Sequence, residues 1–207
     1  MNHLAHFLLA PADDGVRAGT LIADFSRGQD LSGFEPAVET GIRLHRRVDA
    51  LVDASPLVAD LKRLVDVPLR RYAGILLDVF FDYCLIRDWS LHAAMPRADF
   101  AGEVYASLGR MEAYMAPPAP LASARMRRFD ALASCATHEG CARTLARIAT
   151  RLKRPVDLAA GVAVLIRHED EIAATLVALL PALREQTQPY FAGPSFRRRP
   201  SALSAGR

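Results

Sequence analysis

The chain has 207 residues, of which 51% are hydrophobic and 24% charged, and its formal net charge is +3. This composition excludes a disordered or fibrous protein and fits one compact globular domain. The longest apolar region, residues 158–183, carries the polar run RHEDE at 167–171 near its middle, which excludes a helix that crosses a membrane.

Apolar residues recur at helical spacing along almost the whole chain, and the alternating runs typical of strands are absent. We therefore predict an all-α fold, with a single compact multi-helix domain over residues 1–192 and a flexible basic tail over 193–207. Helices are expected at residues 2–10, 17–27, 35–53, 56–65, 68–90, 97–115, 121–135, 138–153 and 156–187.

The cysteines and the first residues predict a cytoplasmic location. Cys84, Cys135 and Cys141 are odd in number and form no CxxC pair, as is usual for thiols in a reducing compartment. The opening stretch MNHLAHFLLAP lacks the basic leader of a secretory signal.

The first expected helices carry polar residues among apolar ones. His3 and His6 lie in an apolar stretch, and Asp24 follows within GTLIADF, where its neighbours predict burial. In the helix at 35–53, His45 and Asp49 lie four residues apart and share the inward face, while Arg43 and Arg47 lie on roughly the opposite side.

The segment GILLDVFFDYCLIR at residues 74–87 is apolar nearly all round, which predicts a helix buried on most sides. Asp78 and Asp82 interrupt it on one face, so a cation must lie near these carboxylates. That cation is either a divalent metal ion or an arginine such as Arg46, Arg70 or Arg71, and the residues alone leave both open. Imidazole and oxygen ligands would suit manganese, zinc or iron.

Four segments together resemble the acyl carrier protein phosphodiesterase family in order and spacing. They are NHLAH at 2–6, GTLIADF at 19–25, GIRLHRRVD at 41–49 and LDVFFDYCL at 77–85, and RPVDL at 154–158 extends the resemblance. The resemblance implies a fold distantly related to the HD-domain phosphohydrolases. It also implies hydrolysis of the phosphodiester that joins 4'-phosphopantetheine to a serine of holo acyl carrier protein, with Mn²⁺ as the usual metal and other divalent ions possible.

Transferred to this sequence, the resemblance implies a metal site and the groups around it. We expect His6, Asp24, His45 and Asp78 as metal ligands, with Asp49 or Asp82 accepting a proton from water or orienting a ligand. Because the carrier protein is acidic, Arg43, Arg46 and Arg47 are expected to contact the substrate.

The sequence departs from the family pattern at Tyr83, Thr20 and Arg43, where the family often has histidine, asparagine and histidine. Tyr83 can still donate a hydrogen bond to a phosphate oxygen, so we expect an altered site rather than an inactive one. Two other functions remain open: an HD-like metal phosphohydrolase acting on a nucleotide, and a noncatalytic helical binding module. Dispersed basic residues and the lack of a recognition motif argue against nucleic-acid binding.

Overall fold

The computed structural model describes residues 3–191, and every regular element in that range is helical, as predicted. The expected tail at 193–207 lies outside the described residues. No helix within residues 3–191 has both the length and the apolar character needed to cross a bilayer. The elements, with η marking 3₁₀ helices, are α1 (His3–Leu9), α2 (Asp14–Ile22), η1 (Ala23–Phe25), α3 (Pro36–Asp53), α4 (Pro56–Leu64), η2 (Leu69–Tyr72), α5 (Ala73–Arg87), α6 (Trp89–His92), α7 (Arg97–Met111), η3 (Glu112–Tyr114), α8 (Ala119–Arg128), η4 (Ala131–Ala133), α9 (His138–Ala149), η5 (Ala159–Gly161), α10 (Val162–Arg167), α11 (Glu169–Thr187) and η6 (Gln188–Phe191).

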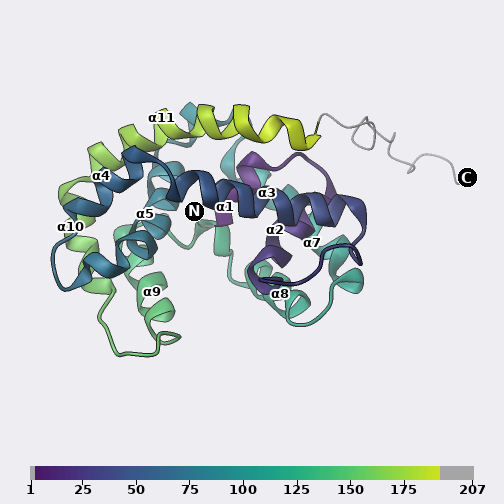
Figure 1. Ribbon diagram of the computed structural model, residues 1–207, viewed down its shortest axis with the longest axis horizontal. Coiled ribbons are helices and arrows are strands. Elements are labelled where there is room, and N and C mark those ends of the chain that lie inside the picture. Colours follow the sequence, from purple (N-terminus) through teal and green to yellow (C-terminus); the bar gives the residue numbers. More distant parts are fainter. Residues whose placement is uncertain (1–2, 192–207) are drawn as a thin grey trace, which may run out of the picture.

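The long helices α3 and α11 pack against each other and extend along the molecule (Figure 1). Helices α2, α7 and α8 gather at the right of the view, and α4, α5, α9 and α10 at the left. Helix α1 lies between the two groups and contacts both α2 and α5. The short N-terminal helix is therefore placed where α2, α3 and α5 can each present side chains to it.

Local signals explain several helix ends. Helix α2 begins at Asp14, three residues earlier than expected, because the Asp13 side chain accepts a hydrogen bond from the backbone N–H of Val16. Helix α3 begins as predicted, with Pro36 at its first position and the Glu35 carboxylate accepting from the next backbone N–H groups.

Two long helices expected from periodicity are divided. The segment at 68–90 forms η2, α5 and the start of α6, with a break at Asp88, and the segment at 156–187 breaks at His168 between α10 and α11. The expected helix at 121–135 ends at Arg128, and Asp130 then adopts a left-handed conformation with φ 43°. Burial of α5 on most sides is confirmed, and all three cysteines are free thiols that lie buried.

Helices α2 and α3 approach each other unusually closely at a pair of glycines. A Cβ atom on Gly19 would lie 2.0 Å from the carbonyl oxygen of Val38, and one on Gly41 would lie 2.1 Å from that of Val16. Only glycine fits at both positions, because any side chain would collide with backbone rather than with a flexible side chain. This crossing brings the C-terminal half of α2 against the middle of α3, where His45 lies.

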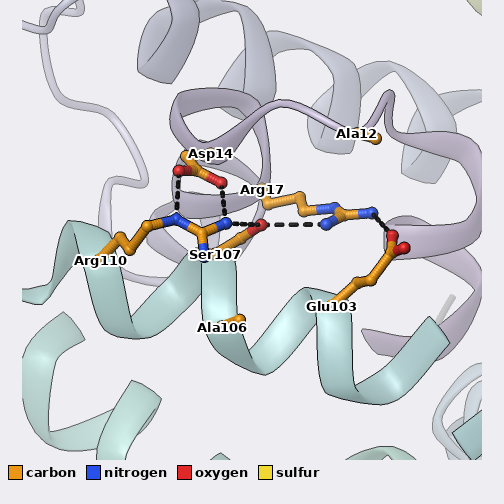
Figure 2. Close-up of a pocket in the computed structure, with 7 residues that line it drawn as sticks. All are labelled: Ala12, Asp14, Arg17, Glu103, Ala106, Ser107 and Arg110. Atoms are coloured by element: carbon orange, nitrogen blue, oxygen red, sulfur yellow. Dashed lines mark hydrogen bonds and ion pairs between the residues drawn. The ribbon is translucent and has the colours of Figure 1, made fainter. Parts of the chain in front are cut away.

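On its other side, α2 is joined to α7 by a polar network around a cavity of about 240 Å³ (Figure 2). The buried Arg17 guanidinium donates to Oγ of Ser107 at 2.9 Å and lies 3.5 Å from Glu103, while Arg110 forms a two-pronged pair with Asp14 at 2.6 and 2.7 Å. Because each arginine faces a carboxylate, the charges balance within the network, and we interpret it as a structural link between the helices.

Candidate metal centre

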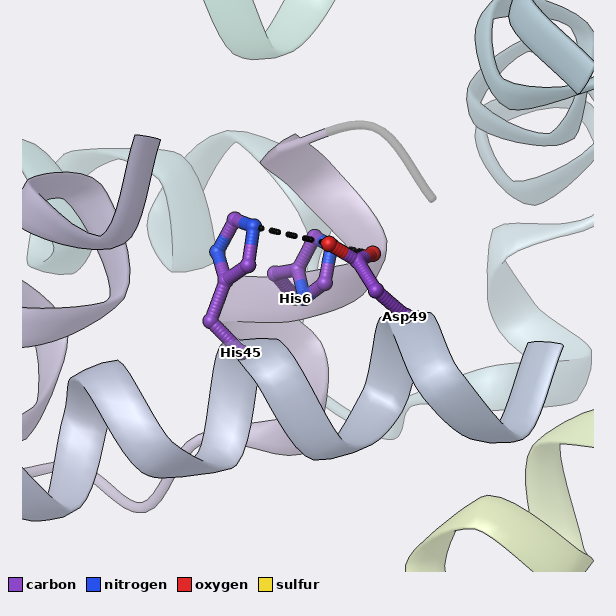
Figure 3. A group of neighbouring side chains, drawn as sticks. All are labelled: His6, His45 and Asp49. Carbon is purple, nitrogen blue, oxygen red and sulfur yellow. Dashed lines mark ion pairs between the residues drawn. The ribbon is translucent and has the colours of Figure 1, made fainter. Parts of the chain in front are cut away.

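Three side chains from two helices converge where α1 crosses α3: His6, His45 and Asp49 (Figure 3). The Asp49 carboxylate faces the Nε2 edges of both imidazoles, with Oδ1 3.1 Å from Nε2 of His6 and Oδ2 3.3 Å from Nε2 of His45. The two rings stack in parallel with centroids 3.8 Å apart. One potential ligand atom from each residue lies within 4.8 Å of the others.

The His45 ring is oriented by the backbone of α2. Its Nδ1 lies 2.9 Å from the carbonyl oxygen of Thr20, and since a carbonyl only accepts, Nδ1 must carry the hydrogen. Only Nε2 then faces Asp49, where it donates a hydrogen bond when protonated and offers a lone pair to a cation when it is not. The sequence did not reveal this contact, although the glycines that make it possible, Gly19 and Gly41, stand in the motifs GTLIADF and GIRLHRRVD.

The protonation states suit metal binding. Burial lowers the pKa of His6 to about 3, despite the hydrogen bond it makes to Asp49, so the imidazole is neutral at physiological pH. Burial tends to raise the pKa of Asp49, but hydrogen bonds from His45 and His6 outweigh it and hold that pKa well below its usual range. A neutral imidazole beside an ionised carboxylate is the donor state that a divalent cation requires.

Asp24 lies at the edge of this group, although the prediction that it is buried was wrong. Its side chain is 40% exposed because α2 ends at Ile22 and the 3₁₀ turn η1 carries Asp24 toward solvent. Its Oδ1 lies 3.6 Å from Nε2 of His45, and its Oδ2 lies 3.7 Å from Nδ1 of His3.

The two aspartates of α5 differ in how deeply they are buried. Asp78 is half-buried, and burial raises the pKa of its carboxyl, with the charge of Asp49 adding to the increase. Asp82 is buried, and its Oδ2 accepts a hydrogen bond from the backbone N–H of Leu4 at 3.4 Å in the first turn of α1. Burial raises the pKa of Asp82 well above its usual value. This placement makes Asp82 a support for the turn that carries His6.

The arginines considered as counter-ions engage other groups. The Arg46 side chain donates to the carbonyl oxygen of Ser26, that of Arg70 donates to the carbonyl oxygen of Val65, and the guanidinium of Arg71 lies 4.7 Å from the ring centre of Tyr72. The contacts described around Asp49 and Asp24 come from imidazoles instead. These contacts favour a metal centre over a network of salt bridges.

Basic side chains line a second cavity on α3. Arg43, Arg46 and Arg47 surround about 290 Å³ together with Tyr190. Arg46 also reaches the carbonyl oxygen of Ser26, two residues beyond Asp24, and so links this group of arginines to the loop that follows Asp24.

Tyr83 lies in a separate polar cluster. Its hydroxyl donates to Oε1 of Glu169 at 3.1 Å, and Nε2 of His138 lies 2.9 Å from the other carboxylate oxygen. Burial, followed by the hydrogen bond to Glu169, raises the pKa of Tyr83 to about 12, so the phenol keeps its proton. A contact between Tyr83 and a phosphate would require Glu169 to release the hydroxyl, and that contact stays a prediction.

The donor set fits a divalent transition ion. Ligands held about 2.1 Å from one ion lie roughly 3 Å apart when they are at right angles, close to the spacings around Asp49. Two imidazole nitrogens and carboxylate oxygens are typical of manganese, iron or zinc sites. The second nitrogen of His45 donates to a backbone carbonyl, an arrangement common among metal-bound histidines.

The family model and the similar proteins that match this chain agree on one family. The family model described as acyl carrier protein phosphodiesterase matches residues 1–183. A Yersinia enterocolitica protein named acyl carrier protein phosphodiesterase is 31% identical over 195 residues, which cover 91% of this chain and 98% of that relative. Proteins of the same name from Photorhabdus laumondii and Escherichia coli are 44% and 43% identical over shorter stretches, 43% and 44% of this chain and 45% and 47% of their own lengths. No solved structure matches the chain.

Proposed function

The chain belongs to the acyl carrier protein phosphodiesterase family, and we propose that it hydrolyses the phosphodiester joining 4'-phosphopantetheine to a serine of holo acyl carrier protein. The products are apo acyl carrier protein and 4'-phosphopantetheine. The observation that carries this proposal is the convergence of His6, His45 and Asp49 in a chain that matches the family along most of its length. The relation to HD-domain proteins and the cytoplasmic location stay predictions from the sequence.

His6, His45 and Asp49 would hold a divalent cation, with Asp24 as a fourth ligand through Oδ1. Such an ion, Mn²⁺ in the first instance, lowers the pKa of water and neutralises the charge of a phosphodiester. The Thr20 carbonyl fixes the hydrogen on Nδ1 of His45, so Nε2 is the atom directed at the ion.

Asp78 is the best placed proton acceptor. It is half-buried beside Asp49, and its raised pKa brings a carboxylate oxygen closer to the basicity that proton transfer at neutral pH requires. Asp49, which the sequence suggested for this task, faces Nε2 of both imidazoles and would act as a ligand. Asp82 holds the first turn of α1 through Leu4 and so positions His6.

The arginines of α3 form the docking surface for the carrier protein. Arg43, Arg46 and Arg47 present positive charge around the cavity that they line with Tyr190, and Arg46 reaches Ser26, two residues beyond Asp24. An acidic protein attracted to this surface would bring its phosphopantetheinylated serine close to the metal ligands.

A mass measurement of holo acyl carrier protein before and after incubation tests the function. We expect the carrier protein to lose the mass of phosphopantetheine less one water, which hydrolysis adds, in the presence of Mn²⁺, and to lose nothing when a chelator is present. An unchanged carrier protein together with hydrolysis of nucleotides would favour a small-molecule phosphohydrolase instead. Failure to retain Mn²⁺ in equilibrium dialysis would favour the binding module.

A further inference from the structure

His3 and Asp24 extend the metal candidates beyond the three mutually close residues. The donor atoms form a continuous series, in which Asp49 touches His6 and His45, His45 touches Asp24 at 3.6 Å, and Asp24 touches His3 at 3.7 Å. His3 is not part of the set whose atoms all lie within 4.8 Å of one another. An ion bound by His6, His45 and Asp49 would therefore not use His3 as a ligand.

The two oxygens of Asp24 face different imidazoles. Oδ1 lies toward Nε2 of His45, and Oδ2 lies toward Nδ1 of His3. A carboxylate with this orientation can bridge two cations, and in two-metal sites that act on phosphates the ions lie about 3.5–4 Å apart. We infer that His3 and Oδ2 of Asp24 form a second divalent-cation position that adjoins the first and stays open to a phosphate. This inference rests on the proposed metal centre.

Charge and exposure support a second cation position that is occupied only when a phosphate binds as well. Among the ligands proposed for the first ion, the carboxylates Asp24 and Asp49 carry two negative charges and balance one divalent ion, so a second ion requires additional negative charge. A phosphate supplies that charge and further oxygen ligands, as it does for cations held by only one or two protein side chains. His3 and Asp24 are 34% and 40% exposed, which leaves room for such a ligand on the solvent side.

The test counts Mn²⁺ ions bound by the full chain, with and without inorganic phosphate, by equilibrium dialysis and elemental analysis. We expect one ion per chain without phosphate and two with it. Electron paramagnetic resonance should show magnetic coupling between the ions only when phosphate is present. In His3→Ala we expect one ion under both conditions and no coupling.

A matched control is His168→Ala, because His168 is exposed to a similar extent, 33%, and pairs with Glu171 far along the chain from this site. It should behave as the unaltered protein does. One ion per chain with and without phosphate, or a second ion retained by His3→Ala, would overturn the second position while leaving the first intact. No bound ion under either condition would overturn the proposed metal centre as well.

Discussion

Replacing Gly41 by alanine tests whether the close crossing of α2 and α3 positions His45, the proposed metal ligand. The new Cβ atom would lie 2.1 Å from the carbonyl oxygen of Val16, whereas real Cβ atoms essentially never approach closer than 3.0 Å. The helices must therefore part by about 0.9 Å at this point. If α2 moves as a rigid body, the 2.9 Å separation between His45 Nδ1 and the Thr20 carbonyl grows to as much as about 3.8 Å, beyond hydrogen-bonding range.

The expected cost follows from three contributions. Overpacking costs about 1–3 kcal/mol, the lost hydrogen bond costs about 1 kcal/mol, and the better helix propensity of alanine returns about 1 kcal/mol. We expect Gly41→Ala to lose about 2 kcal/mol of unfolding free energy, which lowers the Tm by roughly 4–8 °C in a chain of this size. Because His45 also loses its orienting partner, the affinity for Mn²⁺ should fall by about 10–100-fold. Thermal unfolding followed by circular dichroism and Mn²⁺ dialysis measure the two effects.

Gly102→Ala is the matched control, since Gly102 is an exposed residue inside α7 and a Cβ atom there meets nothing within 4 Å. It should stabilise the protein by about 0.5–1 kcal/mol and leave Mn²⁺ affinity unchanged. A folded Gly41→Ala protein that binds Mn²⁺ as tightly as this control would refute the link between the crossing and the metal site.

Four further substitutions and one control probe individual roles. Asp49→Asn should abolish stoichiometric Mn²⁺ binding in dialysis, while Asp53→Asn, one turn further along α3 and 77% exposed, should not. Asp78→Asn should lower kcat by about 10²–10⁴-fold with Mn²⁺ still bound, and loss of the ion instead would make Asp78 a ligand. Asp82→Asn should flatten the pH dependence of stability. Because the pKa of Asp82 is raised in the folded state, the native protein loses unfolding free energy as pH rises above about 4. Asparagine removes this loss because it cannot ionise. This is measured by urea unfolding of metal-free protein. Arg47→Glu should raise KM for the carrier protein and weaken its salt dependence without changing kcat.

The sequence predicted the parts of the centre that lie within one helix. His45 and Asp49 share a face of α3 because four residues make about one turn, and their proximity follows from that spacing alone. The convergence of His6 with them depends on how α1 crosses α3, which the resemblance suggested but periodicity could not give. Asp24 was expected to be buried because its neighbours are apolar, yet η1 turns it outward.

Helix boundaries show the same division between local and tertiary causes. The start of α3 at Pro36 was predictable because proline and a capping carboxylate mark it in the sequence. The break at His168 carries neither glycine nor proline, so the apolar periodicity ran through it without interruption. The apolar residues on nearly all sides of α5 predicted that this helix is buried. They did not predict that Asp82 would accept a hydrogen bond from α1.

The candidate centre includes features that cost folding free energy, and a bound cation would offset that cost. His6 is buried so deeply that its pKa falls to about 3, whereas hydrogen bonds from the two imidazoles keep Asp49 ionised and so stabilise the folded protein. The glycines at the α2–α3 crossing give up helix propensity so that a backbone carbonyl can reach His45. A ligand that binds only the folded state offsets such costs in proportion to the logarithm of its concentration over its Kd. A cation bound by these side chains would therefore stabilise the same geometry that prepares them to bind it.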